Sequence, residues 1–164
     1  MRSDKRRPEG NYLEDFKVGH IYRHFPGKTI TEAECHLFSL ITMNHHPLHI
    51  DATFAEASQH GKILVPGTLV LSLAVGQSVR DISLTAIANL CFDHISHQAP
   101  VFIGDTLRSA SIIRGVRDCK KPDRGIIVVK TVTHNQDETQ VLEFVREVLI
   151  PKRGVPDESA DSGR

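Results

Sequence analysis

Residues 68–79 have the sequence TLVLSLAVGQSV. When this segment is wound at 3.6 residues per turn, apolar side chains occupy nearly every side of it. A helix with so little polar surface is a buried helix. It therefore needs a sheet to enclose it, and we expect the chain that follows to supply that sheet.

Four strand-like segments follow the buried helix. They span residues 86–92, 106–117, 125–132 and 141–150. The first is apolar, the next two are rich in β-branched side chains, and the last alternates between apolar and acidic ones. Turn-forming residues separate the last three, which indicates an antiparallel meander. Helices followed by strands are typical of the α+β class, and this is the predicted fold class.

Two shorter helices are predicted before the buried one. Thr31 and Glu34 fit the capping box, with apolar residues at helical spacing after them. This helix should end near Met43, because Pro47 disfavours helical conformation in the residue before it. Asp51 is a suitable N-cap for a second helix over residues 52–59.

Composition and charge argue against a nucleic-acid-binding, membrane-spanning or secreted protein. The chain has 164 residues, of which 40% are apolar, and its 20 basic and 20 acidic side chains cancel. A nucleic-acid partner would require a basic excess on one face, so none is expected. No apolar run approaches the roughly 20 residues that span a bilayer, so no membrane association is expected either. The basic start lacks the hydrophobic stretch of a secretory signal.

Three cysteines, Cys35, Cys91 and Cys119, form no CxxC pair. This argues against a disulfide framework or a zinc ribbon and favours a cytoplasmic location. Both ends of the chain are polar and charged. We therefore expect one domain over residues 11–153, a disordered segment over 1–10 and a disordered tail over 154–164.

A dense polar cluster, NHHPLHID, occupies residues 44–51. A metal site is one interpretation, but adjacent His45 and His46 point apart and no second ligand cluster is present, so no metal is expected. A structural role is the simplest interpretation of Asp51, as a helix cap. Acid–base chemistry is the third interpretation, since His49 can exchange a proton near neutral pH.

Gly67 follows His49 by eighteen residues and lies at the start of the predicted buried helix. A helix N-terminus offers free backbone N–H groups and a positive dipole end. Such groups can stabilise a developing oxyanion. Asn44 and His49, brought together by a bend at Pro47, can hold a water molecule. This combination suits reversible addition of water to an α,β-unsaturated thioester, in which the charge develops on the thioester oxygen.

The sequence resembles the MaoC-like family of (R)-specific enoyl-CoA hydratases over most of residues 12–153. The stretches that carry the resemblance are EDFKVG at 14–19, TITE at 29–32, PLHID at 47–51, VPGTL at 65–69 and PVFIGDTL at 100–107. The family's motif, Asp-x-Asn-Pro-x-His, contains the catalytic pair, and its oxyanion hole uses a glycine eighteen residues after the His. His49 and Gly67 keep that interval.

The resemblance implies a single hotdog fold and a catalytic set of His49, Asn44 and Gly67. It departs from the family at Asn44, which stands where the family has Asp, because an amide cannot act as a general base as a carboxylate does. His45 or His46 could supply the missing proton-transfer group. The residues expected to bind substrate are His45, His46, Pro66, Thr68 and Arg80, the last through a free substrate carboxylate.

The pattern around Asn44 is similar to the branch of mesaconyl-CoA, β-methylmalyl-CoA and itaconyl-CoA hydratases. It implies a hydro-lyase acting on a short branched or dicarboxylic acyl-CoA. No cofactor is expected, because coenzyme A is part of the substrate. The fold also implies a homodimer. Two alternatives remain open: a hotdog thioesterase that uses Asp51 or Glu56, and a non-catalytic acyl-CoA or acyl-carrier binding subunit.

Overall fold

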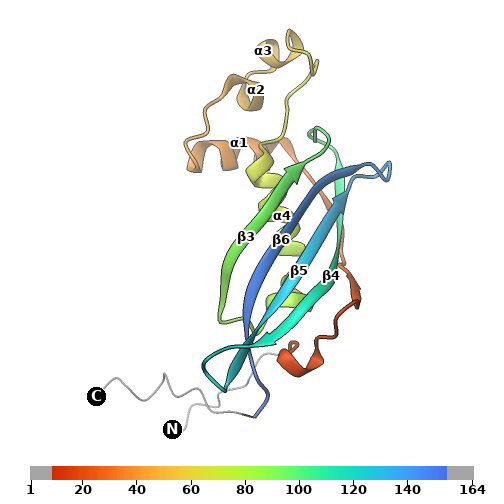
Figure 1. The fold of residues 1–164 in the computed structure, drawn as a ribbon. Helices are drawn as coiled ribbons and strands as arrows, with labels where there is room; N and C mark the ends of the chain where they lie inside the picture. The colour runs from red at the N-terminus through yellow and green to blue at the C-terminus, as the bar shows by residue number, and fades with distance from the viewer. Residues whose placement is uncertain (1–8, 155–164) are drawn as a thin grey trace, which may run out of the picture.

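The computed structural model describes residues 9–154, and every structural statement below refers to that part of the chain. Its centre is an antiparallel sheet in the order β1-β4-β5-β6-β3, with β2 also paired to β4 (Figure 1). The strands are β1 (Ile21–Arg23), β2 (Lys28–Thr29), β3 (Ala88–His97), β4 (Thr106–Asp118), β5 (Arg124–His134) and β6 (Gln140–Pro151). The predicted α+β class and the meander of the last three strands are both confirmed.

Strand β3 differs most from the sequence prediction. It begins and ends later than expected, because it follows β6 past two register shifts, at Asn89/Cys91 and at Asp93/Ser96. Such shifts leave extra residues on one strand and interrupt the alternation that sequence patterns rely on. His94, within the second shift, has a positive φ of 49°. The bulged strand still reaches His97, which pairs with Leu142.

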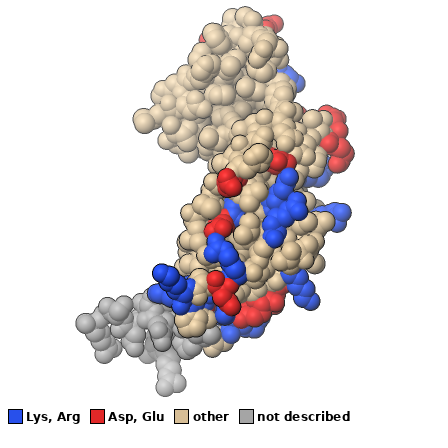
Figure 2. Space-filling view, in the orientation of Figure 1, with Lys and Arg blue, Asp and Glu red and all other residues tan. Residues whose placement is uncertain are grey.

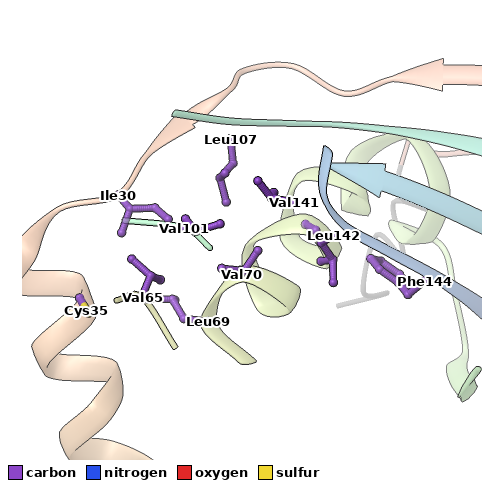
Figure 3. Packing of buried hydrophobic residues seen from close by; sticks show 11 residues of the cluster. Ile30, Cys35, Val65, Leu69, Val70, Val101, Leu107, Val141, Leu142 and Phe144 are labelled. Carbon is purple, nitrogen blue, oxygen red and sulfur yellow. The ribbon is translucent and has the colours of Figure 1, made fainter. Parts of the chain in front are cut away.

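Helix α4 (Gly67–Ser78) lies against one face of the sheet and continues into a π-helical turn, η2 (Val79–Ser83). Its buried residues, Leu69, Val70 and Ala74, pack in a cluster with Leu142 and Phe144 of β6 (Figure 3). The prediction of a buried helix is confirmed for this stripe. The other flank, which includes exposed Ser72 and Gly76, is not covered in the single chain.

A helical lobe stands at one end of the sheet, above the N-terminus of α4 (Figure 1). It contains α1 (Glu32–Ile41), α2 (Pro47–Ile50) and α3 (Ala52–Glu56), while a 3-10 turn, η1 (Leu13–Asp15), lies at the opposite end. The capping box of Thr31 and Glu34 is confirmed, and Asp51 caps α3 through its bond from Phe54 N–H. Helix α3 is shorter than predicted.

Charge is unevenly distributed. On the face shown in Figure 2, basic and acidic side chains gather over the sheet, whereas the helical lobe is mostly neutral. Within residues 9–154, no helix has the length and apolar character needed to cross a membrane. The segments predicted to be disordered, 1–10 and 154–164, lie outside the described residues except for Glu9, Gly10 and Gly154.

Candidate active site

His49 lies on α2, a single helical turn where the sequence analysis expected only a bend at Pro47. Proline fits the first position of a helix because its missing N–H would have no intrahelical acceptor there. The ring of His46 caps the same turn, since its Nδ1 accepts from the Leu48 N–H at 3.2 Å. The backbone of His49 is therefore held in a helical turn.

Two hydrogen bonds tie α2 to the segment that leads into α4. The Leu64 N–H donates to Leu48 O at 3.0 Å, and His49 Nδ1 donates to Leu64 O at 2.6 Å. A carbonyl oxygen can only accept, so Nδ1 must carry the ring proton. In the neutral ring Nε2 is then a free acceptor, which is the state required to take a proton from water.

Gly67 begins α4 three residues after Leu64. Three residues of extended chain span at most about 11 Å, so the His49 ring and the start of α4 are held in one region. The N-cap is Pro66, whose side chain makes no capping bond, and no backbone carbonyl in the described range accepts the Gly67 N–H. This N–H is available to an oxygen of a bound molecule, at the positive end of the helix dipole.

A small hollow of about 110 Å³ opens beside Gly67, and one of its walls is the ring of His97. The other lining residues are Leu64, Val65, Val70, Ala99, Pro100 and Val101. A Cβ placed on Gly67 would lie 2.9 Å from both Cε1 and Nε2 of His97. Only glycine therefore fits at this position while the ring stays where it is.

Burial lowers the pKa of the His97 imidazole from its ordinary value. The residue is nevertheless exposed in the single chain, and neither of its ring nitrogens has a hydrogen-bond partner within residues 9–154. His97 was not among the residues predicted to act in the site. No local pattern could have placed it here, because its contact with Gly67 joins two elements thirty residues apart.

Asn44 lies in the turn after α1, where Met43 has a positive φ of 56° and the Asn44 N–H donates to Ser39 O at 2.9 Å. Its side-chain amide is half-buried and makes no hydrogen bond with any residue of the described range, His49 included. His45 is exposed. The His46 ring is 5.9 Å from the His49 ring, centroid to centroid, so these two histidines are neighbours.

Three of the remaining predicted residues belong to α4 or its ends. Pro66 is buried and Thr68 is exposed, and both flank Gly67. Arg80 is exposed in η2, thirteen residues beyond Gly67. At 1.5 Å per residue this is about 20 Å along the helix, so the structure does not bring Arg80 to the same place. Arg80 lines a different groove, of about 630 Å³, with Phe25, Leu73 and Leu84 among its walls.

Among the described residues, the buried arginine is Arg146 on β6, which was not predicted from the sequence. Its guanidinium donates to Ser78 Oγ at 2.8 Å and to Asn89 Oδ1 at 3.0 Å, while Nε has no partner. Burial lowers its pKa to about 10. Ser78 is the last residue of α4 before the π-helical turn, so Arg146 joins β6 to the junction of α4 and η2.

A second polar group, also not predicted, anchors η2 to the sheet. His24 Nδ1 is 2.7 Å from Asp81 Oδ2, and His24 Nε2 is 2.8 Å from Ser111 Oγ. Burial lowers the pKa of His24, and the Asp81 carboxylate partly opposes that effect. The His24 side chain is fully buried and Ser111 is also bound to Thr131, so this row of hydroxyls is engaged within the fold. No metal-binding group of three or more His, Cys, Asp or Glu side chains occurs in residues 9–154.

A long helix packed against an antiparallel sheet that curves around it defines the hotdog class. A double-hotdog protein from Mycobacterium tuberculosis superimposes with a TM-score of 0.81 at 25% identity, over 90% of this chain and 46% of that one. A MaoC-domain dehydratase structure from Chloroflexus aurantiacus gives a TM-score of 0.85 at 35% identity, over 94% of this chain and 44% of that one.

Residues 15–136 match the MaoC-like domain, and the chain belongs to that family. Two curated relatives are a β-methylmalyl-CoA dehydratase from Chloroflexus aurantiacus, at 35% identity, and a mesaconyl-CoA hydratase from Cereibacter sphaeroides, at 33%. Each match covers 88% of this chain, and 41% and 42% of the respective relative. The chain thus spans about two fifths of the length of these relatives.

Gly67→Ala tests the contact at the start of α4. The added methyl group must displace the His97 ring, so we expect the His97 Cε1–H resonance and its titration midpoint to shift in NMR spectra. Gly76→Ala, on the same helix with open space around its Cα, is the matched control. It should leave His97 unchanged and stabilise the protein by about 0.5–1 kcal/mol. An unchanged His97 resonance in Gly67→Ala would contradict the contact.

Proposed function

We propose that the chain is an acyl-CoA hydratase/dehydratase that adds water reversibly across an α,β-unsaturated acyl-CoA. The observation that carries this proposal is the connection between His49 and the start of α4. His49 bonds to Leu64 O through Nδ1 and keeps Nε2 free, and three residues after Leu64 the N–H of Gly67 is uncapped. A base for water and a donor for the thioester oxygen are the two groups that such an addition requires.

The chemistry follows from these two positions. Water bonds to the β-carbon through its oxygen, and one of its protons goes to His49 Nε2. The π electrons move toward the thioester oxygen, and the Gly67 N–H together with the α4 dipole stabilises the resulting enolate. A proton then adds to the α-carbon. In the reverse direction, protonated His49 gives its proton to the departing hydroxyl group.

A short branched or dicarboxylic acyl group is the proposed substrate class. Its support is the similarity to relatives named for mesaconyl-CoA and β-methylmalyl-CoA. The hollow beside Gly67, at about 110 Å³, is also small. Asn44 is proposed to hold the water or a substrate oxygen, since its amide has no partner of its own in the described part of the chain.

We propose that the working unit is a homodimer joined along β3. This strand has no neighbour on its outer side, and Leu90, Phe92 and Ile95 on it are 41–47% exposed. An open, apolar sheet edge is a surface that pairs readily with another strand. The two curated relatives are more than twice as long as the region that matches. A second copy of this chain would therefore supply the surface that the remaining sequence supplies in those relatives.

The free thiols of all three cysteines support the expected cytoplasmic location.

Within residues 9–154, the carboxylate that a thioesterase of this fold would use is not found beside the start of α4. Asp51 is exposed and its Oδ1 accepts the Phe54 N–H as a cap, and Glu56 ends α3 on the exposed side of the lobe. Release of free coenzyme A, followed with a thiol reagent, separates thioester hydrolysis from hydration.

Activity is tested by incubating the protein with mesaconyl-, itaconyl- and crotonyl-CoA and following the loss of enoyl absorbance. We expect turnover of at least one of them without release of free thiol. His49→Ala should lower kcat by about 10²- to 10⁴-fold, because it removes the acid–base group. His20→Ala, at an exposed site on the opposite end of the sheet, should behave like the parent. Absence of turnover with all three substrates would contradict the proposal.

Asn44→Asp distinguishes an enzyme from a non-catalytic acyl-CoA binding subunit. If Asn44 sets specificity, restoring the family's carboxylate should raise hydration of crotonyl-CoA several-fold relative to mesaconyl-CoA. A binding subunit predicts instead that the parent and the variant both bind acyl-CoA without turning it over. Parallel titration calorimetry with butyryl-CoA measures that binding.

Leu90→Lys tests the dimer. A lysine at the proposed sheet–sheet junction should shift the mass from twice 18.3 kDa toward 18.3 kDa in sedimentation equilibrium. Val18→Lys, at a residue 65% exposed and distant from β3 in the sheet order, should not change the mass. A parent protein that is monomeric at micromolar concentration would overturn this assignment.

A further inference from the structure

The proposed reaction needs a group that exchanges the proton at the α-carbon, and His49 accounts only for the water at the β-carbon. An amide has no readily transferable proton, so Asn44 does not fill this role. His46 uses its Nδ1 to cap α2 and lies beside His49. His45 is exposed and has no side-chain hydrogen bond in the described range.

His97 is in the right place for this role. An oxygen bound to the Gly67 N–H has its carbonyl carbon and then its α-carbon one and two bonds away. The edge of the His97 ring lies against the position that a Gly67 Cβ would take, with Nε2 2.9 Å from that point. It is the one ionisable side chain among the residues that line the hollow.

We propose that His97 is the second proton-transfer residue of this site and exchanges the α-proton of the acyl-CoA. The proposal rests on the proposed hydratase function and assigns the group that replaces the family's carboxylate. In dehydration, a neutral His97 nitrogen takes the α-proton, the C–H electrons form the enolate, and protonated His49 releases the β-hydroxyl as water. His97 then loses its proton to solvent and His49 regains one, so protons balance over a turnover.

The surroundings of His97 keep it in the form that this step needs. Its neighbours in the hollow are apolar or backbone groups, and burial against them favours the neutral ring. The charged groups on the adjoining strands are engaged elsewhere, since the Glu143 carboxylate is bound by Lys130 and approached by His94. Because the pKa of His97 is lowered, the base form persists below the usual histidine range, and activity in dehydration should be lost only as pH falls through that lowered pKa.

The test is α-proton exchange of butyryl-CoA, a saturated thioester, in D2O, followed by mass spectrometry. The parent should incorporate deuterium, and His97→Gln should do so about 10²- to 10⁴-fold more slowly, with a similar loss of kcat in hydration. His94→Gln, on the same strand with a side chain 68% exposed, is the matched control and should exchange like the parent. The low-pH limb of kcat/KM for dehydration should be absent from the residual activity of His97→Gln.

The outcomes separate the two proposals. If the parent hydrates enoyl-CoA and His97→Gln exchanges and hydrates at the parent rate, the role of His97 is wrong and the hydratase function stands. If the parent neither hydrates nor exchanges, the proposed function itself fails. Circular dichroism checks that the variant is folded, and His97→Asn replaces it if it is not. Parent-like exchange by His97→Asn would overturn the role equally.

Discussion

Helix α4 is held in one orientation because its buried stripe, Leu69, Val70 and Ala74, packs against Leu142 and Phe144 of the sheet. Burial of Leu69 and Val70 contributes about 1.5–3 kcal/mol each, so the helix cannot rotate or slide without a large loss. Its N-terminus is therefore fixed where β3 ends and where the segment from Leu64 arrives. The positions of Gly67, His97 and His49 all follow from that packing.

Polar groups at the other end of α4 complete its placement. A buried guanidinium without a carboxylate partner costs several kcal/mol of desolvation, which the bonds from Arg146 to Ser78 and Asn89 offset in part. His24 and Asp81 hold the π-helical turn to the sheet. One end of the helix is thus anchored by polar contacts, and the opposite end keeps its N–H groups free.

Local signals in the sequence predicted a large part of this arrangement. The capping box at Thr31, the cap at Asp51 and the alternation along β6 depend on neighbours within a few residues, and the structure confirms them. The resemblance to the family, which includes the eighteen-residue interval from His49 to Gly67, predicted that these two residues belong to the proposed site. They lie on α2 and at the start of α4. His97 and Arg146 were missed because their positions depend on pairing between β3 and β6 and on contact with α4, which no local pattern encodes.

Apolar side chains are exposed on the surface of the single chain. The curated relatives are longer and have additional sequence that could cover the equivalent surface. The outer edge of β3 and the exposed α1 residues Leu37, Leu40 and Ile41 are of this kind. The outer edge of β3 has no strand partner in the single chain and would be paired in the proposed dimer. His97 is the last residue of β3. Assembly and the geometry of the proposed site are therefore linked through one strand.

A crystal structure with bound butyryl-CoA would show where the thioester lies relative to Gly67, His49 and His97. We expect the thioester oxygen within hydrogen-bond distance of the Gly67 N–H, with His49 Nε2 toward the β-carbon and the His97 ring toward the α-carbon. An acyl chain bound instead in the groove beside Arg80 and Phe25, at the far end of α4, would contradict this expectation.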